Sequence, residues 1–328
     1  MENYFIESNA YNPWYNLAVE KYLADYVQKE EVILYLWQNQ NTVVIGQNQN
    51  ALRECRVQLL EAEGGYLARR STGGGAVYQD LGNLCFTFVA SEERYDVEEQ
   101  LKIVMKACQK YGICSHFSGR NDLLTDDNRK FSGSAFSMTS RGKVQHGTLM
   151  INVDVNKLQR YLTPTQEKLK AKGIASVSSR VCNLQELNTG LTVDGMRAAL
   201  RAAFEEQYGR CTELSLDMLN NDKIQEYYKM YSSWDWRYGR SPECETVYSH
   251  RFTWGEVEVN LKLHNLIISE CKVYSDALEV QFPNMLEGLL LNQRYDIQNI
   301  QIPEFHKADE ELAKQLKETI MWFSGVWR

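Results

Sequence analysis

The chain contains, from residue 69 to residue 78, the stretch Arg69-Arg70-Ser71-Thr72-Gly73-Gly74-Gly75-Ala76-Val77-Tyr78. Three successive glycines let the backbone approach a ligand closely and expose its N–H groups. The two arginines before them can meet an anion. The spacing is neither the G-x-x-x-x-G-K-S/T of a P-loop nor the G-x-G-x-x-G of a dinucleotide-binding fold. By glycine content alone, a flexible hairpin loop between two strands is an equally good interpretation.

A second stretch joins polar residues to small ones. It begins with Asn121-Asp122-Leu123 and continues with Arg129-Lys130-Phe131-Ser132-Gly133-Ser134-Ala135. Lys130 stands between a loop and the small residues, which would let a bulky ligand approach it. Taken alone, a lysine is usually solvated, and Asp122 is more often a cap or a salt-bridge partner than a metal ligand.

Two more stretches lie further along the chain. Gln145-His146-Gly147-Thr148 opens an apolar segment, in which Gly147 suggests close approach of a backbone, whereas His146 alone is best explained as structural. Residues 168–180 are basic and rich in serine, which is typical of a solvated loop or of a lid that folds over phosphate. The residues of interest in that segment are Lys172, Gly173, Ser178 and Arg180.

Length, charge and cysteine usage exclude several classes of protein. With 328 residues the chain is long enough for two domains. A net charge of -7 argues against a nucleic-acid-binding protein, which normally shows a basic face. Apolar runs are far shorter than the ~20 residues of a membrane span, and the first residues do not resemble a signal peptide. The eight cysteines show no C-x-x-C spacing, so we expect reduced thiols, no zinc site and a cytoplasmic protein.

Hydrophobic periodicity and capping residues predict mixed strands and helices over most of the chain. Helices are expected after the N-cap residues Asn12, Asp96 and Thr192, and around residues 224–231. Strands are expected at residues 32–37, 42–45, 83–89 and 149–153, with alternating side chains in the last two. We therefore predict an α+β fold for residues 1–245.

The remaining residues, 246–328, are expected to form a small α+β accessory domain behind a linker at residues 237–249. Alternating apolar residues over 257–274, interrupted by a turn at His264-Asn265, predict a hairpin. Apolar residues at helical spacing over 312–323 predict a C-terminal helix.

These stretches, in this order and spacing, resemble the lipoate–protein ligases of the biotin/lipoate ligase superfamily. Further matching blocks are Asn12-Pro13-Trp14, Leu17-Ala18-Val19-Glu20, Trp37-Gln38-Asn39, Val43-Val44-Ile45-Gly46 and Phe252-Thr253-Trp254-Gly255. The resemblance covers essentially the whole chain. It implies a biotin/lipoate-ligase-like catalytic domain of mixed sheets and helices, followed by the accessory domain.

The resemblance also implies a two-step reaction. Lipoate and ATP, with Mg²⁺, give lipoyl-AMP and pyrophosphate, and a lysine of a lipoyl carrier domain then displaces AMP. The carrier would be an acyltransferase subunit of a 2-oxoacid dehydrogenase, the glycine-cleavage H protein, or both. No tightly bound cofactor, nucleic acid or membrane is implied, and we expect a monomer.

By motif, the resemblance implies roles for individual residues. Lys130 is the expected catalytic residue, and Asp122 is a candidate ligand of Mg²⁺. The residues expected to bind lipoate, ATP and lipoyl-AMP are Arg70, Ser71, Gly74, Gly75, Ala76, Val77, Tyr78, Asn83, Asn121, Asp122, Lys130, His146 and Gly147. The loop expected to cover the adenylate contains Lys172, Gly173, Ser178 and Arg180. Two positions depart from the family pattern: Gln47 stands where some members carry a basic residue, and Cys182 replaces a common threonine.

The implied chemistry fits these residue types. A carboxylate must become a mixed anhydride before an amine can attack it, and its attack on the α-phosphate builds negative charge that a fixed lysine and backbone N–H groups stabilise. Burying about five methylenes of lipoate at roughly 0.8 kcal/mol each gives about 4 kcal/mol. That corresponds only to about millimolar binding, so the carboxylate or adenylate end must supply the rest of the affinity.

Three alternatives stay open. The first is an ATP-independent octanoyl or lipoyl transferase that forms a thioester on a cysteine, for which Cys182 is the best candidate. The second is a biotin ligase, whose Arg/Gly-rich loop has a different pattern. The third is a non-catalytic lipoate-binding protein, against which the presence of Lys130 argues.

Overall fold

A computed structural model describes residues 2–118, 121–163, 181–239, 244–275, 277, 279, 281–295, 300, 302–303 and 310–326. The chain forms two compact units, Met1–Arg237 and Tyr238–Arg328. The division predicted after residue 245 falls inside a strand of the second unit, so the units part earlier in the chain than the composition suggests. No helix in the described ranges is both long and apolar enough to span a membrane.

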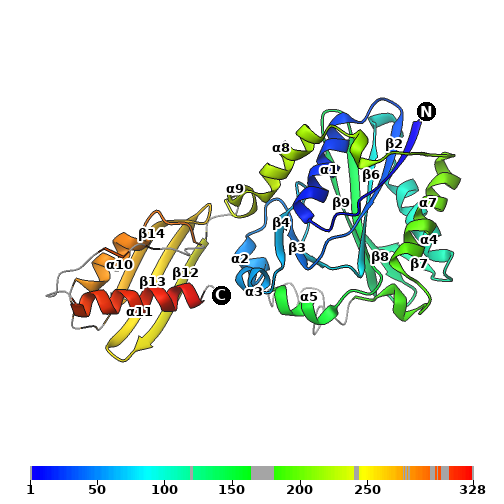
Figure 1. Ribbon diagram of the computed structural model, residues 1–328. Coiled ribbons are helices and arrows are strands. Elements are labelled where there is room, and N and C mark those ends of the chain that lie inside the picture. The colour runs from blue at the N-terminus through cyan, green and yellow to red at the C-terminus, as the bar shows by residue number, and fades with distance from the viewer. Residues whose placement is uncertain are drawn as a thin grey trace. The chain divides into compact units, whose positions relative to one another are not determined.

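The first unit is built on a mixed eight-stranded sheet of order β11-β1-β2-β6-β10-β9-β8-β7 (Figure 1). Its strands are β1 (Glu2–Glu7), β2 (Glu31–Trp37), β6 (Asn83–Ala90), β7 (Ser115–Ser118), β8 (Asp122–Thr125), β9 (Lys130–Met138), β10 (Lys143–Met150) and β11 (Thr212–Glu213). Strand β1 runs parallel to β2 and β11, and the other pairs are antiparallel.

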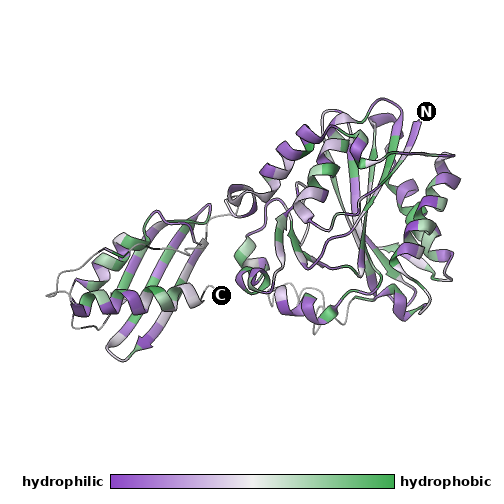
Figure 2. Ribbon diagram, viewed as in Figure 1, coloured by the Kyte–Doolittle hydropathy of each residue, from purple (hydrophilic) through white to green (hydrophobic). Residues whose placement is uncertain are grey.

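Helices cover both faces of this sheet. Helices α1 (Pro13–Tyr26) and α8 (Asn221–Ser232) pack on one face, and α4 (Val97–Gln109) and α7 (Val193–Tyr208) pack on the other (Figure 1). Every residue of β6 is consequently buried, and apolar residues are frequent in the strands that lie between these helices (Figure 2). Successive side chains of β6 therefore point alternately into two hydrophobic cores, one on each face of the sheet, and neither face of this strand is exposed to water.

The three predicted helix starts are confirmed. The Asn12 side chain accepts hydrogen bonds from the amides of Trp14 and Tyr15, Asp96 accepts from Glu99, and Thr192 accepts from Gly195. These contacts satisfy amides that have no partner within the helix. Short 3-10 turns lie at Glu92–Arg94, Leu184–Glu186 and Leu216–Met218.

The strand predicted at residues 149–153 is wrong in its bounds, because β10 ends at Met150. The amides of Ile151 and Asn152 both donate to the Gly82 carbonyl, which turns the chain away from the sheet. The Asn183 side chain then bonds both the amide and the carbonyl of Val153.

A second, three-stranded sheet carries the glycine-rich stretch. In it β3 (Thr42–Ile45) lies between the parallel strand β4 (Tyr66–Arg69) and the antiparallel strand β5 (Val77–Gln79). Residues 70–76 are thus the connection between the two outer strands. Short helices accompany this sheet: α2 (Ala51–Glu54), α3 (Val57–Ala62), α5 (Val155–Tyr161) and α9 (Trp234–Arg237).

The second unit contains the antiparallel sheet β12-β13-β14 and two helices. Its elements are β12 (Cys244–Phe252), β13 (Gly255–His264), β14 (Ile267–Ser275), α10 (Phe282–Leu290) and α11 (Glu310–Val326). The predicted hairpin and C-terminal helix are confirmed, with Asn265 and Leu266 at φ 51° and 55° in the turn. The linker predicted at residues 237–249 is wrong from residue 244 onward, because β12 begins there.

Candidate functional site

A cavity of about 500 Å³ lies between the 70–76 connection and the large sheet of the first unit. All but one of the expected ligand-binding residues in the described ranges line it. The lining members are Arg70, Gly74, Gly75, Ala76, Val77, Tyr78, Asn83, Asn121, Asp122, Lys130, His146 and Gly147. Residues that are distant in sequence therefore line one cavity.

One face of the large sheet forms the floor of this cavity. In β10, His146 lies between Ala135 of β9 and Thr87 of β6, and Thr148 lies between Gly133 and Cys85. Side chains alternate between the two faces along a strand, so these residues share one face. The small residues on β9 leave room above the sheet.

Arg70 holds the glycine-rich connection in shape. Its Nη2 donates to the carbonyls of Gly73 (2.7 Å) and Gly75 (2.8 Å), and its Nη1 donates to the carbonyl of Val44 (3.2 Å). Gly74 has φ 92°, and a Cβ there would lie 2.9 Å from Nη2, so only glycine fits this position without strain. Burial lowers the pKa of Arg70 to about 10, and the nearby Glu20 carboxylate opposes this effect, so the guanidinium is charged at neutral pH.

The same arrangement leaves backbone N–H groups free. A trans peptide directs its C=O and N–H to opposite sides, so the amides of Gly74 and Ala76 point away from Arg70 when the carbonyls of Gly73 and Gly75 point toward it. Within the described part of the chain, the amides of Gly74, Gly75 and Ala76 have no hydrogen-bond acceptor. Successive free amides of this kind form an anion-binding concavity.

Arg69 does not meet an anion in the cavity, contrary to the expectation for the arginine pair. It is 0% exposed, and its guanidinium donates to the carbonyls of Gly46, Gln47, Gln49, Trp236 and Arg237. Trp236 returns a bond from its Nε1 to the Arg69 carbonyl (2.8 Å). Arg69 is therefore a structural clamp beneath the site.

Lys130 reaches the cavity at the start of β9. Its Nζ lies 2.7 Å from Oδ1 of Asp122, the first residue of β8, and both side chains are half-buried. A Cβ on Gly133 would lie 2.7 Å from this Nζ, so the glycine provides the space that the ammonium group occupies. The carbonyl of Lys130 accepts the amide of Cys182, which fixes the backbone at this point.

A buried polar network lies beneath the cavity. His146 Nδ1 is 2.9 Å from both carboxylate oxygens of Glu20, and His146 Nε2 is 3.0 Å from Thr72 Oγ1. The Thr87 hydroxyl donates to Glu20 (2.7 Å) and accepts from Trp37 Nε1 (3.0 Å). Glu20 and Thr72 were not among the expected site residues. A carboxylate within the apolar run Leu17-Ala18-Val19-Glu20 is the sequence signal that could have identified the first.

Four of the expected residues have contacts that serve the structure: Asn121, Gly147, Asn83 and Ser71. Asn121 lines the cavity, but its Nδ2 donates to the Ser134 carbonyl (2.7 Å). The position of Gly147 is explained by packing, since a Cβ there would lie 2.3 Å from the Phe86 ring on the opposite face of the sheet. Asn83 donates to Cys85 Sγ (3.3 Å). Ser71 does not line the cavity; its hydroxyl lies near the Tyr231 phenol and opposes the burial that raises the pKa of that phenol.

The remaining lining is largely apolar and forms a slot beside the polar groups. Its side chains come from α1, β2, β3, β6, β10 and the region of α5. They are Leu17, Trp37, Val44, Cys85, Met150, Leu158 and Leu162. An aliphatic chain fits such a lining, and its carboxylate would face the polar end of the cavity.

Cys182 lacks the properties of a nucleophile. It is 1% exposed and does not line the cavity, and its Sγ donates to the Asn183 carbonyl (3.2 Å). Burial, followed by the neighbouring Glu186, raises the pKa of Cys182 to about 11, so little thiolate exists at neutral pH.

Metal ligands are sparse around the cavity. Among the described residues, no three carboxylate, histidine or cysteine side chains gather closely enough to hold a metal ion. Asp122 is the only acidic residue of the described lining, and it is paired with Lys130. A Mg²⁺ ion that arrives on the phosphates of a nucleotide needs only one or two carboxylates, and Asp122 fits that requirement.

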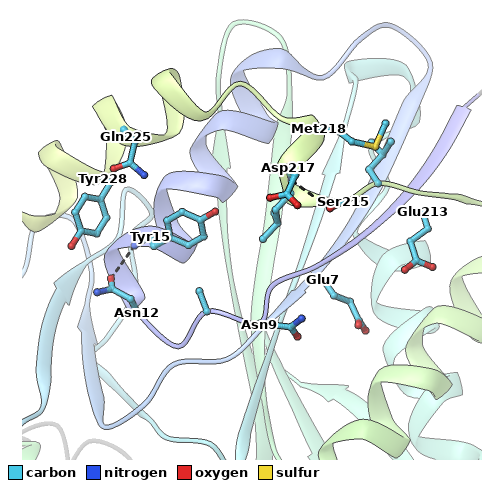
Figure 3. A pocket seen from close by; sticks show the side chains of 13 residues that line it. Glu7, Asn9, Asn12, Tyr15, Glu213, Ser215, Asp217, Met218, Gln225 and Tyr228 are labelled. Carbon is cyan, nitrogen blue, oxygen red and sulfur yellow. Dashed lines mark hydrogen bonds between the residues drawn. The ribbon is translucent and has the colours of Figure 1, made fainter.

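A larger and more open cavity, of about 1080 Å³, lies elsewhere on the first unit (Figure 3). Glu7, Glu213 and Asp217 line it, and Ser215 and Asn12 bond nearby backbone amides. Three carboxylates repel an anionic ligand, and none of the expected residues lies there. The smaller cavity is therefore the better candidate site. The expected covering-loop residues Lys172, Gly173, Ser178 and Arg180 lie outside the described residues.

Known families and proteins match this chain along most of its length. The family described as "Lipoyl protein ligase A/B catalytic domain" matches residues 12–205, and "Bacterial lipoate protein ligase C-terminus" matches residues 241–319. A lipoate-protein ligase A of Psychrobacter cryohalolentis is 38% identical over 98% of this chain and 97% of that protein. One of Blochmanniella floridana is 38% identical over 90% and 89%, respectively.

Solved structures show the same fold. The crystal structure of P. falciparum LipL1 in complex with lipoate matches with a TM-score of 0.63 and 28% identity, over 98% of this chain and 99% of that one. A bipartite lipoate protein ligase from Thermoplasma acidophilum, described with its E2 lipoyl domain, matches with a TM-score of 0.65 and 27% identity, over 72% and 96%.

Proposed function

The chain belongs to the lipoate–protein ligase family, and from this premise we propose that it activates lipoate with ATP in the 500 Å³ cavity and transfers the lipoyl group to a carrier lysine. One observation carries the proposal. Lys130 lines one cavity, beside an apolar slot, together with Gly74, Gly75 and Ala76, whose amides have no acceptor in the described part of the chain. That arrangement suits a ligand with an aliphatic tail and an anionic head.

In the first step, the lipoate tail occupies the apolar slot and its carboxylate attacks the α-phosphate of ATP. Negative charge grows on the phosphoryl oxygens, and pyrophosphate leaves. Lys130 and the loop amides stabilise that charge without reorganising, because Asp122 fixes the ammonium and Arg70 fixes the loop. One such group contributes ~2.7–4 kcal/mol to lowering the barrier. Mg²⁺ on the ATP phosphates would offset further charge.

In the second step, the carrier lysine attacks the acyl carbonyl of lipoyl-AMP. Electrons move onto the carbonyl oxygen and then expel AMP, and the attacking nitrogen loses a proton to the departing phosphate or to water, which leaves an amide bond. With the acyl–phosphate junction placed beside the Lys130 ammonium, as we propose, Lys130 can donate a hydrogen bond to the developing oxyanion. The adenylate is hydrolysed by water unless it is shielded, which is the role we propose for the basic segment at residues 168–180.

The partner that best fits this reaction is a lipoyl carrier domain. The Thermoplasma relative was described together with its E2 lipoyl domain. We extend this partner class to the present chain and include the glycine-cleavage H protein as a second carrier. We further propose that the chain acts as a monomer.

A lipoylation assay with and without ATP tests the proposal. The purified chain, lipoate and a lipoyl domain are incubated, and the domain is analysed by intact mass and by mapping of the modified lysine. We expect modification that requires both lipoate and ATP. Transfer from an octanoyl-carrier protein in the absence of ATP would instead support the cysteine transferase, although the buried Cys182 does not favour it.

A further inference from the structure

A charged residue is buried in the middle of an apolar helix. Glu20 is 4% exposed, and it lies on the face of α1 that packs against the large sheet. Burying a carboxylate is costly unless hydrogen bonds compensate, and Glu20 accepts them from Thr87 and His146. A helix that needed only to pack would be more stable with an apolar residue at this position.

His146 is hydrogen-bonded through both of its ring nitrogens. Its Nδ1 donates to the Glu20 carboxylate, which only accepts. Its Nε2 lies 3.0 Å from the Thr72 hydroxyl oxygen, which can donate or accept. Arg70 Nε in turn donates to Thr72 Oγ1 over 2.9 Å. Every group in this chain of bonds has a compatible role.

This series of hydrogen bonds, from Glu20 through His146 and Thr72 to Arg70, ends at the glycine-rich connection. Besides Thr72, Arg70 bonds the carbonyls of Gly73 and Gly75, which orients the amides that follow them. The Thr72 carbonyl also accepts the amide of Gln47, so this residue is anchored on both its backbone and its side chain.

Threonine, histidine and glutamate at these distances also resemble a nucleophile, base and acid. That interpretation fails here. Thr72 is 1% exposed and does not line the cavity, and one lone pair of its oxygen accepts from Arg70. No substrate atom could reach the hydroxyl.

We propose that Glu20, His146 and Thr72 form a positioning relay that fixes the Arg70 side chain and so aims the loop amides at the reacting phosphate. Glu20 and Thr72 are positioning residues in this account, since neither lines the cavity. The inference rests on the proposed function, because the amides are assigned a role in adenylate formation. It predicts that damage to a buried threonine that does not line the cavity lowers the turnover rate.

Thr72→Val tests the relay, because it keeps the shape of the side chain and removes the hydroxyl. We expect a folded protein whose kcat in lipoate-dependent ATP–pyrophosphate exchange falls by about 10- to 10²-fold, with the KM of lipoate little changed. Thr72→Ser, which restores the hydroxyl, should recover most of the rate. Thr42→Val is the matched control. Like Thr72, Thr42 is buried and does not line the cavity, and its hydroxyl donates one bond, to the Gln40 carbonyl, which lies outside the relay.

Coupling separates a relay from general destabilisation. The effects of Thr72→Val and Glu20→Gln should be strongly non-additive, whereas Thr42→Val and Glu20→Gln should be additive. The relay is overturned if Thr72→Val lowers kcat no more than Thr42→Val does, or if its effect and that of Glu20→Gln simply multiply. If Thr72→Val does not fold, Glu20→Gln alone must lower kcat, and an unchanged kcat overturns the relay.

Hydrogen exchange distinguishes failure of the relay from failure of the proposed function. Amides 73–76 should exchange faster in Thr72→Val and Glu20→Gln than in the wild type, and not in Thr42→Val. This readout needs no substrate. If the wild type shows no ATP–pyrophosphate exchange but the variants show this pattern of hydrogen exchange, the proposed function is contradicted and the relay is supported. Unchanged hydrogen exchange at amides 73–76 in both relay variants would contradict the relay.

Discussion

Gly133→Ala is expected to disable the site while sparing the fold. A Cβ at this position would lie 2.7 Å from Lys130 Nζ and 2.9 Å from its Cε, where ordinary contact begins at 3.4 Å. The ammonium must therefore move by about 0.7 Å from the position in which it contacts Asp122 at 2.7 Å. The collision is with the end of a flexible side chain, so the backbone has no reason to shift.

The size of the effect follows from this displacement. A misplacement of about 1 Å costs about 10²-fold in rate, so we expect kcat for pyrophosphate exchange to fall by about 10- to 10²-fold. Removing the group in Lys130→Ala should cost more, about 10²- to 10³-fold, or ~2.7–4 kcal/mol. The melting temperature of Gly133→Ala should stay near the wild-type value, since replacing glycine with alanine also restricts the unfolded chain.

The double variant gives the sharpest test. In a Lys130→Ala background the colliding atoms are absent, so Gly133→Ala should have no further effect on exchange. Gly288→Ala is the matched control, because a Cβ there meets nothing within 4 Å. The reasoning is refuted if folded Gly133→Ala exchanges at the wild-type rate, or if it lowers the residual rate of Lys130→Ala by the same factor as that of the wild type.

Three further predictions concern the loop, the cysteine and the second unit. Gly75→Val should weaken lipoate and ATP binding in calorimetry without unfolding the chain, since a Cβ at Gly75 enters open space of the cavity; unchanged affinity would make the loop an ordinary turn. Cys182→Ser should retain ligase activity. Iodoacetamide at about pH 7 should modify the exposed Cys114 long before Cys182, because the raised pKa of Cys182 keeps its thiol protonated. The reverse order of modification would restore the transferase alternative. A chain ending at Arg237 should lose adenylation. It should still transfer lipoyl from supplied lipoyl-AMP, because every described lining residue precedes residue 182. Normal adenylation by this shortened chain, shown to be folded by circular dichroism, would contradict that division.

Capping residues and hydrophobic periodicity predicted several helices and strands of this protein. The caps at Asn12, Asp96 and Thr192 act within one helical turn, so the sequence around each contains the whole interaction. Strand β12 was missed for the opposite reason. Its side chains alternate between polar and apolar only weakly, and its pairing with β13 is not visible in a single segment.

Many of the residues that line the candidate cavity were predicted as a set, whereas the contacts that each of them makes were not. Arg69 and Arg70 are neighbours of one type, yet one clamps backbone beneath the site and the other shapes the loop. Which role each takes depends on where strand β4 ends and on Trp236, far along the chain. The Glu20–His146 pair spans 126 residues, and its partnership follows only from the packing of α1 on the large sheet.

The central claim is that this cavity forms lipoyl-AMP from lipoate and ATP before any carrier binds. Exchange of labelled pyrophosphate into ATP, measured with lipoate and without a carrier protein, tests it most directly. We predict exchange that requires lipoate and is nearly abolished in Lys130→Ala. No exchange from a folded wild-type chain that still lipoylates its carrier, or equal exchange with and without lipoate, would contradict the claim.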